Sequence, residues 1–262
     1  MAIHLDLTGK TAICTGATSG IGRAVAIELA NAGASVIAVG RDEKRLAEVA
    51  SEIAAGGGKV FPTQIDLIDS GAPSAIVAAA LEHTGSVDIL ASCAGIYESA
   101  AVGQEGTDTI GVLDRQWELN TRAPFRLAEA VVPHLKSGSS VVFISSTMAR
   151  FGIGWGAGYS MSKAAIEALM RVMAVELGPS GIRVNAISPG WIITPMNEQA
   201  RADPAIEQFA IAATPLSRLG TPEEIASVVV FLASEAATYI HGTVICAEGG
   251  YPALPMGMLQ DA

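Results

Sequence analysis

Residues 11–22 read TAICTGATSGIG: a short apolar run, Thr11–Thr15, passes directly into a glycine-rich turn, Gly16–Gly22. The run suits a buried strand, and the pattern of Arg23–Asn31 predicts a helix after the turn. Glycines let a backbone approach a pyrophosphate, and a helix N-terminus attracts its negative charge. Strand, turn and helix therefore indicate a nucleotide site. The spacing GxxxGxG differs from the GxGxxG fingerprint, so this turn alone leaves a plain tight turn as the alternative.

Apolar runs alternate with helical patterns along the rest of the chain, which is typical of βαβ units and of a parallel sheet covered on both faces. We predict an α/β fold: a single Rossmann-type, doubly wound parallel sheet of about seven strands. The whole chain, 1–262, is expected to form one Rossmann-fold domain, with 251–262 as a C-terminal tail. The expected strands are Thr11–Thr15, Ser35–Val39, Val60–Ile65, Val87–Ala91, Ser140–Ile144, Arg183–Ile187 and Thr243–Ala247.

Capping residues predict where two helices begin, and two other stretches lack a regular pattern. Asp42 is expected to cap a helix that ends at the glycines of 56–58, and Thr221–Glu224 reads as a capping box with proline at the first helical position. The least regular stretches are Tyr97–Gly111 and Trp191–Pro215. Such segments after strand ends are where binding sites are usually built.

Composition excludes several classes of protein. The 262 residues are 50% hydrophobic and carry a formal net charge of −10, which argues against disorder, nucleic-acid binding and anionic membranes. No apolar run reaches the ~20 residues of a membrane span, and the first residues do not read as a signal peptide. Three cysteines without a CxxC and four scattered histidines predict neither disulfides nor a metal site. A cytoplasmic location is the expectation.

Tyr159 and Lys163 are four residues apart at the start of a helical pattern, so they share one helix face. A nearby ammonium favours phenolate, which would lower the pKa of Tyr159 toward working pH and make it a general acid/base. Taken alone, such a pair is also what surface neighbours look like. Ser146, at the end of an expected strand, and Asn120, in a helical stretch, are two further polar residues in the same chain order.

Together these motifs resemble the short-chain dehydrogenase/reductase family over nearly the whole chain. The family's TGxxxGIG stands at Thr15–Gly22 and its YxxxK at Tyr159–Lys163, with Ser146 thirteen residues before the tyrosine. Further matching positions are Asp66-Leu67, Pro189-Gly190, Thr194, and the C-terminal stretches 218–226 and 231–234.

The resemblance implies reversible hydride transfer between a nicotinamide cofactor and a secondary alcohol or ketone. Ser146 would bind the substrate oxygen, and Tyr159 would give or take its proton. Lys163 would lower the tyrosine pKa and bind the nicotinamide ribose, and Asn120 would hold a water that relays protons.

The resemblance also assigns cofactor contacts to the ends of several strands. These residues are Gly16, Thr18, Ser19, Gly20, Ile21, Gly22, Arg41, Asp66, Leu67, Cys93, Ala94, Gly95, Tyr159, Lys163, Pro189, Gly190, Ile192 and Thr194. One departure is Ser92–Gly95, which reads SCAG where the family has Asn-Asn-Ala-Gly. We expect altered hydrogen bonding there and retained activity. A smaller departure is Glu248, where the family usually has Asp.

Large apolar side chains near these motifs predict a largely apolar substrate pocket, although core packing explains each one singly as well. The expected lining residues are Ser146, Met148, Trp155, Tyr159, Trp191 and Met196, with Tyr97 and Phe151 close by. Arg150 is the nearby cation that could clamp a carboxylate. The interpretation favours an uncharged alcohol or ketone, cyclic or aromatic.

Three other functions stay open at this point. One is an NAD-dependent alcohol or polyol dehydrogenase working mainly in the oxidative direction. Another is a non-catalytic nucleotide-binding regulator, which would be expected to lack Tyr159 or Lys163. A third is a lyase, epimerase or dehydratase on the same scaffold, whose relatives carry a longer C-terminal substrate domain.

The end of the second expected strand bears on cofactor choice. An acidic residue there binds the ribose 2′-hydroxyl of NAD(H) and repels a 2′-phosphate, but this chain has Gly40 followed by Arg41. A guanidinium can bind the phosphate bidentately. We therefore expect NADP(H) to be preferred, with NAD(H) possible; Arg41 as a solvated loop residue is the alternative.

The helix from Tyr159 to Leu177 is apolar around much of its circumference, so one face can pack on the sheet while another needs a partner. With the family resemblance this predicts a homotetramer. The apolar tail after Gly250 is expected to reach a neighbouring subunit.

Overall fold

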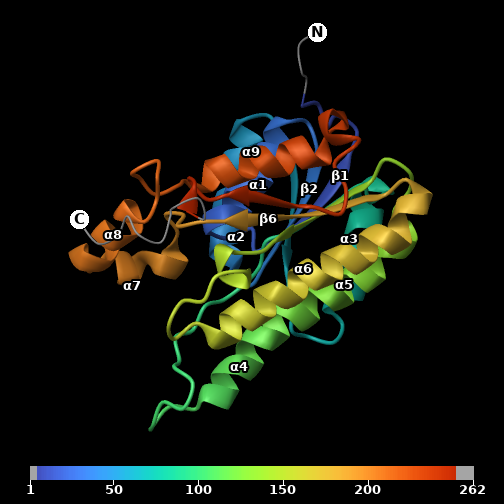
Figure 1. The fold of residues 1–262 in the computed structure, drawn as a ribbon. Helices are drawn as coiled ribbons and strands as arrows, with labels where there is room; N and C mark the ends of the chain where they lie inside the picture. The colour runs from blue at the N-terminus through green and yellow to red at the C-terminus, as the bar shows by residue number, and fades with distance from the viewer. Residues whose placement is uncertain (1–4, 252–262) are drawn as a thin grey trace.

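The computed structural model describes residues 5–251, and in them seven strands form one parallel sheet in the order β3-β2-β1-β4-β5-β6-β7 (Figure 1). The predicted fold class and all seven predicted strands are confirmed, with ends that move by up to two residues. The strands are β1 Thr11–Thr15, β2 Ser35–Gly40, β3 Lys59–Gln64, β4 Ile89–Ser92, β5 Ser140–Ile144, β6 Arg183–Pro189 and β7 Val244–Ala247.

The sheet changes direction between β1 and β4. β1, β2 and β3 follow one another outward to one edge, after which the chain returns to place β4 on the other side of β1. Thr15 pairs with Ser92 at the carboxyl ends of these two strands. In open parallel sheets, a crevice opens where the strand order reverses, and ligands bind there. The glycine turn and the SCAG segment therefore meet at this crevice.

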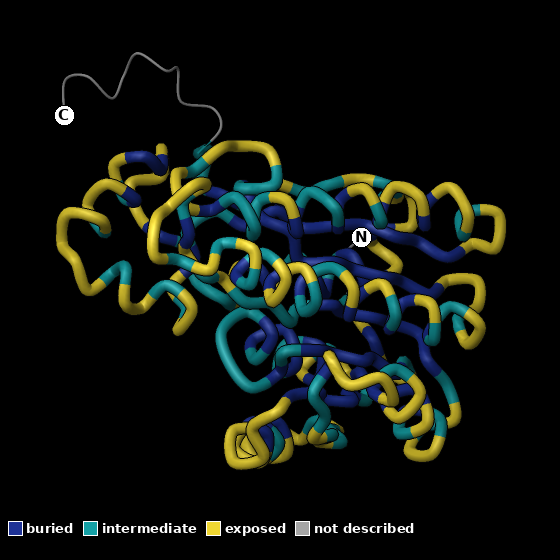
Figure 2. The backbone as a smooth tube through the Cα atoms, turned by 90° about the horizontal axis from the view of Figure 1, so that it is seen from below, coloured by how far each residue is buried: buried dark blue, intermediate teal, exposed yellow. Residues whose placement is uncertain are grey.

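Helices cover both faces of the sheet, as Figure 1 shows, and the buried backbone lies between them in Figure 2. One face is covered by α1 (Gly20–Asn31), α2 (Glu43–Ala55) and α9 (Pro222–Ala233), which pack in one hydrophobic cluster. The other face is covered by α3 (Ala72–Thr84), α5 (Ala123–Val131) and α6 (Ala157–Leu177), which pack in a second cluster. Because the inner strands β1, β2, β4, β5 and β6 are buried on both faces, apolar runs without alternation were their sequence signal.

The predicted helix starts are confirmed. Asp42 accepts a hydrogen bond from the Arg45 N–H at the start of α2, at 3.0 Å. Thr221 and Glu224 form the capping box of α9. Hydrogen bonds from Arg218 and from the Thr221 N–H hold the pKa of Glu224 down at about 2.

The two stretches predicted to be irregular differ. Residues 97–108 contain no helix or strand, and α4 (Thr109–Trp117) begins after them. By contrast, 191–215 is largely helical, so that prediction was wrong: η5 (Pro195–Asn197), α7 (Glu198–Arg201) and α8 (Pro204–Ala212) occupy it. Asp203 caps α8 just before a proline at the first helical position, a start signal that the sequence analysis overlooked.

The remaining helical turns are short connections. They are η1 (Glu118–Arg122), η2 (Val132–His134), η3 (Thr147–Ala149), η4 (Gly178–Ser180) and η6 (Glu235–Ala237). Among residues 5–251, no helix is both long and apolar enough to cross a bilayer. Apart from Tyr251, the predicted C-terminal tail lies outside the described residues.

Candidate functional site

The glycine turn after β1 folds tightly against the segment after β4. Gly16 has a φ of +69°, which disfavours a side chain, and a Cβ there would lie 2.9 Å from the Ala94 Cα. A Cβ on Gly22 would overlap the Gly16 carbonyl oxygen. These glycines are therefore required by the close packing of the turn, which brings its backbone to the crevice.

The first turn of α1 presents its N–H groups to that crevice. Ser19 stands at the N-cap, yet its side chain accepts no hydrogen bond from the helix. Thr194, in the loop after β6, lies against the start of α1: a Cβ on Gly20 would be 3.2 Å from the Thr194 Cγ2. Backbone donors, absent side chains and a helix N-terminus are what a pyrophosphate requires, so the residues present fit a dinucleotide.

Two backbone N–H groups of the SCAG segment, Ser92–Gly95, are hydrogen-bonded to the side chain of Thr15. The Thr15 Oγ1 accepts from the Cys93 N–H at 3.1 Å and from the Ala94 N–H at 3.2 Å. The Cys93 thiol lies beside Cys14, and this neighbour together with burial raises the pKa of Cys14. The segment is thus held to β1 through Thr15.

An open pocket of about 590 Å³ lies at the ends of β2 and β3, where Arg41 and Asp66 are among the lining residues. The exposed Arg41 Nη1 lies 3.5 Å from the Asp66 Oδ2. Leu67 is buried in the core beside it. A side chain on Gly40 would overlap the Thr18 Cγ2, so this glycine also has a packing reason that the sequence does not reveal.

Asn120 lies in the π-helical turn η1 between α4 and α5 and is 1% exposed. Its Oδ1 accepts from the Ile96 N–H at 2.8 Å, and its Nδ2 donates to the Ile96 carbonyl at 2.9 Å. Nδ2 also donates to the Ser162 Oγ at 3.1 Å. Both amide donors are thus used to join the segment after β4 to α6; the predicted water relay stays a prediction.

Lys163 is buried beneath the same segment. Its Nζ donates to the Ile144 carbonyl at 2.9 Å and lies 5.6 Å from the centroid of the Tyr159 ring. Burial disfavours the charged form and lowers the pKa of Lys163 to about 8. Ser162, one residue earlier, donates to the Tyr159 carbonyl at 2.7 Å, so one turn of α6 carries both residues of the YxxxK motif.

Tyr159 faces Ser146 across the site. Burial raises the pKa of Tyr159 to about 12, while a hydrogen bond with Ser146 acts in the opposite direction. Burial thus acts against the lowering of the Tyr159 pKa expected from Lys163, whose effect on the phenol stays a prediction. The Ser146 Oγ also accepts from the Met148 N–H at 3.1 Å, at the start of η3.

Tyr97 is the aromatic residue that contacts the Tyr159 ring. The Tyr97 ring meets the Tyr159 ring edge-on, with centroids 5.3 Å apart and an interplanar angle of 84°. Met148 packs against Gly156, and Trp155 is 64% exposed with a φ of +62°. A left-handed conformation is strained for such a residue. The Trp155 carbonyl accepts from the Ala100 N–H at 2.8 Å, which ties its loop to the segment after β4.

The structure does not gather every predicted substrate residue around Tyr159. Trp191 lines a separate pocket of about 220 Å³ with Gly190, Ile192 and residues 246–249. Met196 is an exposed residue of η5. Pro189 ends β6, and the adjoining Gly190 lies so close to Glu248 that a Cβ would come within 2.8 Å of its Cα.

Arg150 is occupied within the protein. Its Nη2 donates to the Ser188 Oγ at 2.9 Å and to the Cys246 Sγ at 3.1 Å, and it lies 3.8 Å from the Glu248 Oε2. Burial raises the pKa of Glu248. The Arg150 guanidinium is therefore engaged by groups of the protein, which compete with its use as a carboxylate clamp.

Sequence reasoning missed one buried polar residue of the site, Gln116, which is 0% exposed. Its signal is its position four residues before Asn120, which puts two carboxamides on one face of the helical segment. No group of three His, Cys, Asp or Glu residues within 5–251 is placed to hold a metal ion.

Comparisons with known proteins agree with this geometry. A family model described as enoyl-(acyl carrier protein) reductase matches residues 16–252. The 7alpha-hydroxysteroid dehydrogenase of Escherichia coli (strain K12) is 37% identical over 249 residues, covering 94% of this chain and 96% of that protein. The L-rhamnose 1-dehydrogenase (NAD(P)(+)) of Sphingomonas sp. (strain SKA58) is 36% identical over 248 residues, covering 93% and 96%.

Solved structures show the same likeness. A crystal structure described as an NAD(P)-dependent gluconate 5-dehydrogenase from Beutenbergia cavernae, with bound NADP at low occupancy, is 38% identical to this chain. The two superpose with a TM-score of 0.87, covering 96% of this chain and 100% of that one.

We expect Gly16→Ala to weaken the binding of a nicotinamide dinucleotide at least about tenfold, because the methyl group meets Ala94 and a positive φ strains alanine. Isothermal titration calorimetry measures this. Gly57→Ala is the matched control, since Gly57 has a similar φ of +80° and nothing within 4 Å of the added Cβ. Equal affinities for the two variants would show that close packing of the turn does not matter.

Proposed function

The chain belongs to the short-chain dehydrogenase/reductase family, and on this premise we propose that it transfers a hydride reversibly between a nicotinamide cofactor and a secondary alcohol or ketone. The observation that carries the proposal is the placement of Tyr159 and Ser146 at the carboxyl edge of the sheet that also carries the glycine turn. Lys163 is hydrogen-bonded to the Ile144 carbonyl at the end of β5, and Asn120 to Ser162 on the helix that carries Tyr159.

The cofactor, Ser146, Tyr159 and Lys163 have separate roles in the proposed reaction. When bound, the cofactor supplies the hydride acceptor or donor at its nicotinamide ring. Ser146 binds the substrate oxygen and keeps it beside the phenol. With a pKa of about 12, Tyr159 holds its proton at neutral pH, which suits donation to the oxygen during ketone reduction. In oxidation, the Lys163 ammonium favours the phenolate that accepts the proton.

The proposed substrate is an uncharged, cyclic or aromatic ketone or alcohol. Tyr97 meets the Tyr159 ring, Met148 packs against Gly156 just before α6, and the exposed Trp155 precedes that glycine, so apolar side chains gather at this end of α6. The engagement of Arg150 with Ser188 and Cys246 leaves that cation unavailable to a substrate carboxylate. The similarity to a hydroxysteroid dehydrogenase supports the same class.

Tyr159→Phe is expected to lower kcat at least about 100-fold while leaving the Kd for NADP(H) nearly unchanged, because only the proton donor is lost and the ring still packs. Steady-state kinetics and calorimetry measure the two effects. Tyr239→Phe, at a fully exposed position, is the control. A variant that keeps more than about a hundredth of the wild-type kcat would refute the general acid/base role.

We further propose that NADP(H) is preferred over NAD(H), since Arg41 is exposed at the pocket and its 3.5 Å ion pair with Asp66 is a surface contact that a 2′-phosphate can replace. The NADP in the Beutenbergia cavernae structure supports this choice. The wild type should show a higher kcat/KM with NADP(H). Arg41→Ala should lower that value about tenfold or more and change the value for NAD(H) little.

Reversal of the preference needs two changes together. Gly40→Asp introduces a carboxylate that repels the phosphate, but its Cβ overlaps the Thr18 Cγ2. Thr18→Ser removes that methyl group, so the double variant should favour NAD(H), and Thr18→Ser alone should behave like the wild type. A wild-type preference for NAD(H) contradicts the proposal.

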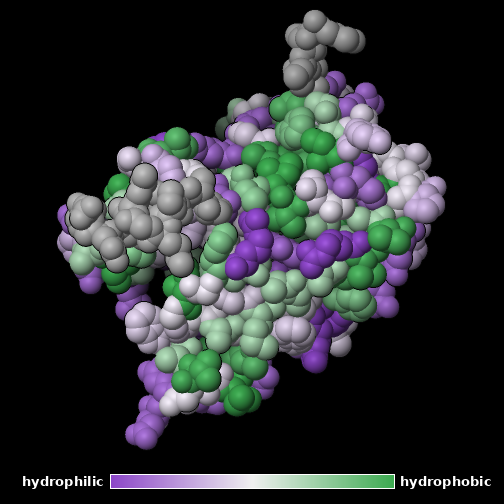
Figure 3. Space-filling model, in the orientation of Figure 1, coloured by the Kyte–Doolittle hydropathy of each residue, from purple (hydrophilic) through white to green (hydrophobic). Residues whose placement is uncertain are grey.

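We infer a homotetramer. The outer face of α6 exposes Met161, Val172 and Val175, the last to 79%, and Phe125 is exposed on α5. Figure 3 shows hydrophobic side chains over α6 and α9 on one face of the molecule. β7 is an edge strand and so offers a second site for pairing. Exposed apolar surface of this kind favours association.

Light scattering at roughly micromolar concentration should therefore give four times the mass of the chain. Val172→Asp combined with Val175→Asp should reduce this mass to that of a smaller species, because charges would be buried at an interface. A wild-type monomer at that concentration rules out the tetramer.

A further inference from the structure

Two carboxamides, one helical turn apart, bind alternate residues of the segment after β4. Asn120 binds both backbone groups of Ile96. Gln116 does the same for Glu98: its Oε1 accepts from the Glu98 N–H at 3.1 Å, and its Nε2 donates to the Glu98 carbonyl at 3.3 Å. As along the edge of a strand, the two bound residues turn their N–H and C=O toward the same side.

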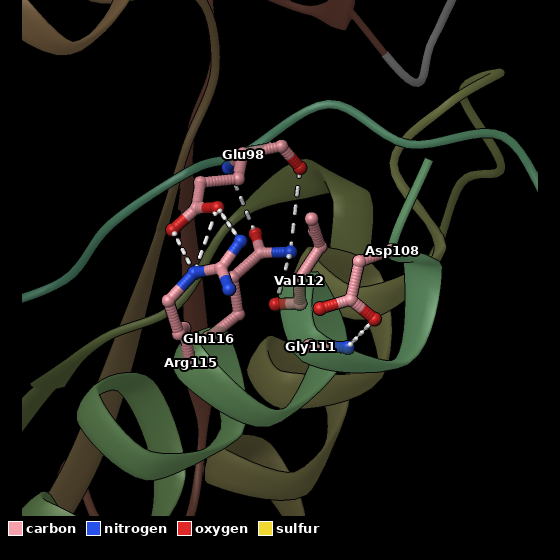
Figure 4. Close-up of polar contacts among 6 residues, drawn as sticks. All are labelled: Glu98, Asp108, Gly111, Val112, Arg115 and Gln116. Atoms are coloured by element: carbon pink, nitrogen blue, oxygen red, sulfur yellow. Dashed lines mark hydrogen bonds and ion pairs between the residues drawn. The ribbon is translucent and has the colours of Figure 1, made fainter. Parts of the chain in front are cut away.

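Gln116 is enclosed from every side. It is 0% exposed, and its Nε2 also lies 3.4 Å from the Val112 carbonyl of the same helix. Figure 4 shows its carboxamide directed at the Glu98 backbone. A Cβ on Gly158 would lie 2.8 Å from the Nε2, so Gln116 packs under the first turn of α6, next to Tyr159. Its rotamer is therefore fixed by packing.

Glu98 has a second, solvent-exposed contact through its side chain. Arg115 Nη2 donates to the Glu98 carboxylate at 2.6 Å, and Asp108 caps α4 through the Gly111 N–H at 2.9 Å (Figure 4). The Arg115 and Glu98 side chains are 54% and 34% exposed, so this ion pair contributes little. The buried amide is the contact that determines where the backbone lies.

Tyr97 lies between the two bound residues. Because successive side chains of an extended segment point to opposite faces, holding the backbone of Ile96 and Glu98 also sets the face on which the Tyr97 ring lies, where it meets the Tyr159 ring edge-on. Its position thus follows from backbone that Gln116 and Asn120 hold. Without the Gln116 amide, the Glu98 N–H and C=O would lose their buried hydrogen-bond partner. The orientation of the Tyr97 ring against Tyr159 would then no longer be held.

We propose that Gln116 is a positioning residue that sets Tyr97 as the wall beside Tyr159 and thereby determines which ketones fit. The proposal rests on the proposed function, because Tyr97 selects substrate only if a ketone binds at Tyr159. A fixed aromatic wall favours bulky ring substrates, which lie along it, over small ones that do not reach it.

The test combines crystal structures with a double-mutant cycle on two probe ketones, decalone and cyclohexanone. Gln116→Met keeps the volume and removes both hydrogen bonds. It should displace the Tyr97 ring from Tyr159 and raise KM for decalone about tenfold, with kcat and the cyclohexanone constants within about twofold. Tyr97→Ala, which removes the ring, should raise KM for decalone by a similar factor, and the KM of the double variant should equal that of Tyr97→Ala alone.

Arg115→Met is the matched control, since it removes the bonds to the Glu98 side chain and leaves the backbone clamp; its constants should stay within about twofold of the wild type. If Gln116→Met does not fold, Gln116→Glu, which keeps an acceptor for the Glu98 N–H, replaces it in the same cycle.

An unmoved Tyr97 ring in the variant crystal overturns the proposal. So do additive losses in the double variant, because a merely structural defect adds to the loss of Tyr97 and also lowers kcat for both ketones. If the wild type reduces neither ketone, the proposed function fails instead, and the position of the Tyr97 ring alone then decides whether Gln116 is a clamp.

Discussion

The site depends on one buried carboxamide. Asn120 joins Ile96, from the segment after β4, to Ser162 on α6, and Ser162 in turn bonds to the Tyr159 carbonyl. The π-helical turn η1 places this amide by interrupting the regular helix at this position. Without it, the backbone after β4 would lose its hydrogen-bonded link to the helix that carries Tyr159, although that helix would still pack on the sheet.

A second constraint is burial, which shifts the two titrating residues in opposite directions. Loss of hydration raises the pKa of Tyr159 to about 12 and lowers that of Lys163 to about 8. Each shift favours the neutral form, as expected when charges leave water. Burial therefore keeps the proton on the Tyr159 phenol, which suits a group that donates it in ketone reduction.

The sheet could be predicted from sequence, because strands buried on both faces read as continuous apolar runs. The candidate site could be predicted because Asn120, Ser146, Tyr159 and Lys163 follow one another in the order that the family resemblance recognises. What the sequence could not reveal depends on three-dimensional contact. The direction of the Tyr159 pKa follows from burial, and Gly40 is needed because of Thr18, twenty-two residues away. Gln116 looks like a surface residue until the loop that it binds is in view. The helices of 191–215 were missed although Asp203 and Pro204 signalled one of them.

The central claim is hydride transfer to a carbonyl carbon, and isotope labelling tests it directly. Reduced cofactor carrying deuterium in both positions of its nicotinamide C4 is incubated with the enzyme and a panel of uncharged ketones, and the alcohol is analysed by mass spectrometry and NMR. The account predicts one deuterium on the carbinol carbon of the product. Alcohol without deuterium at that carbon, or no alcohol from any ketone of the panel, would contradict it.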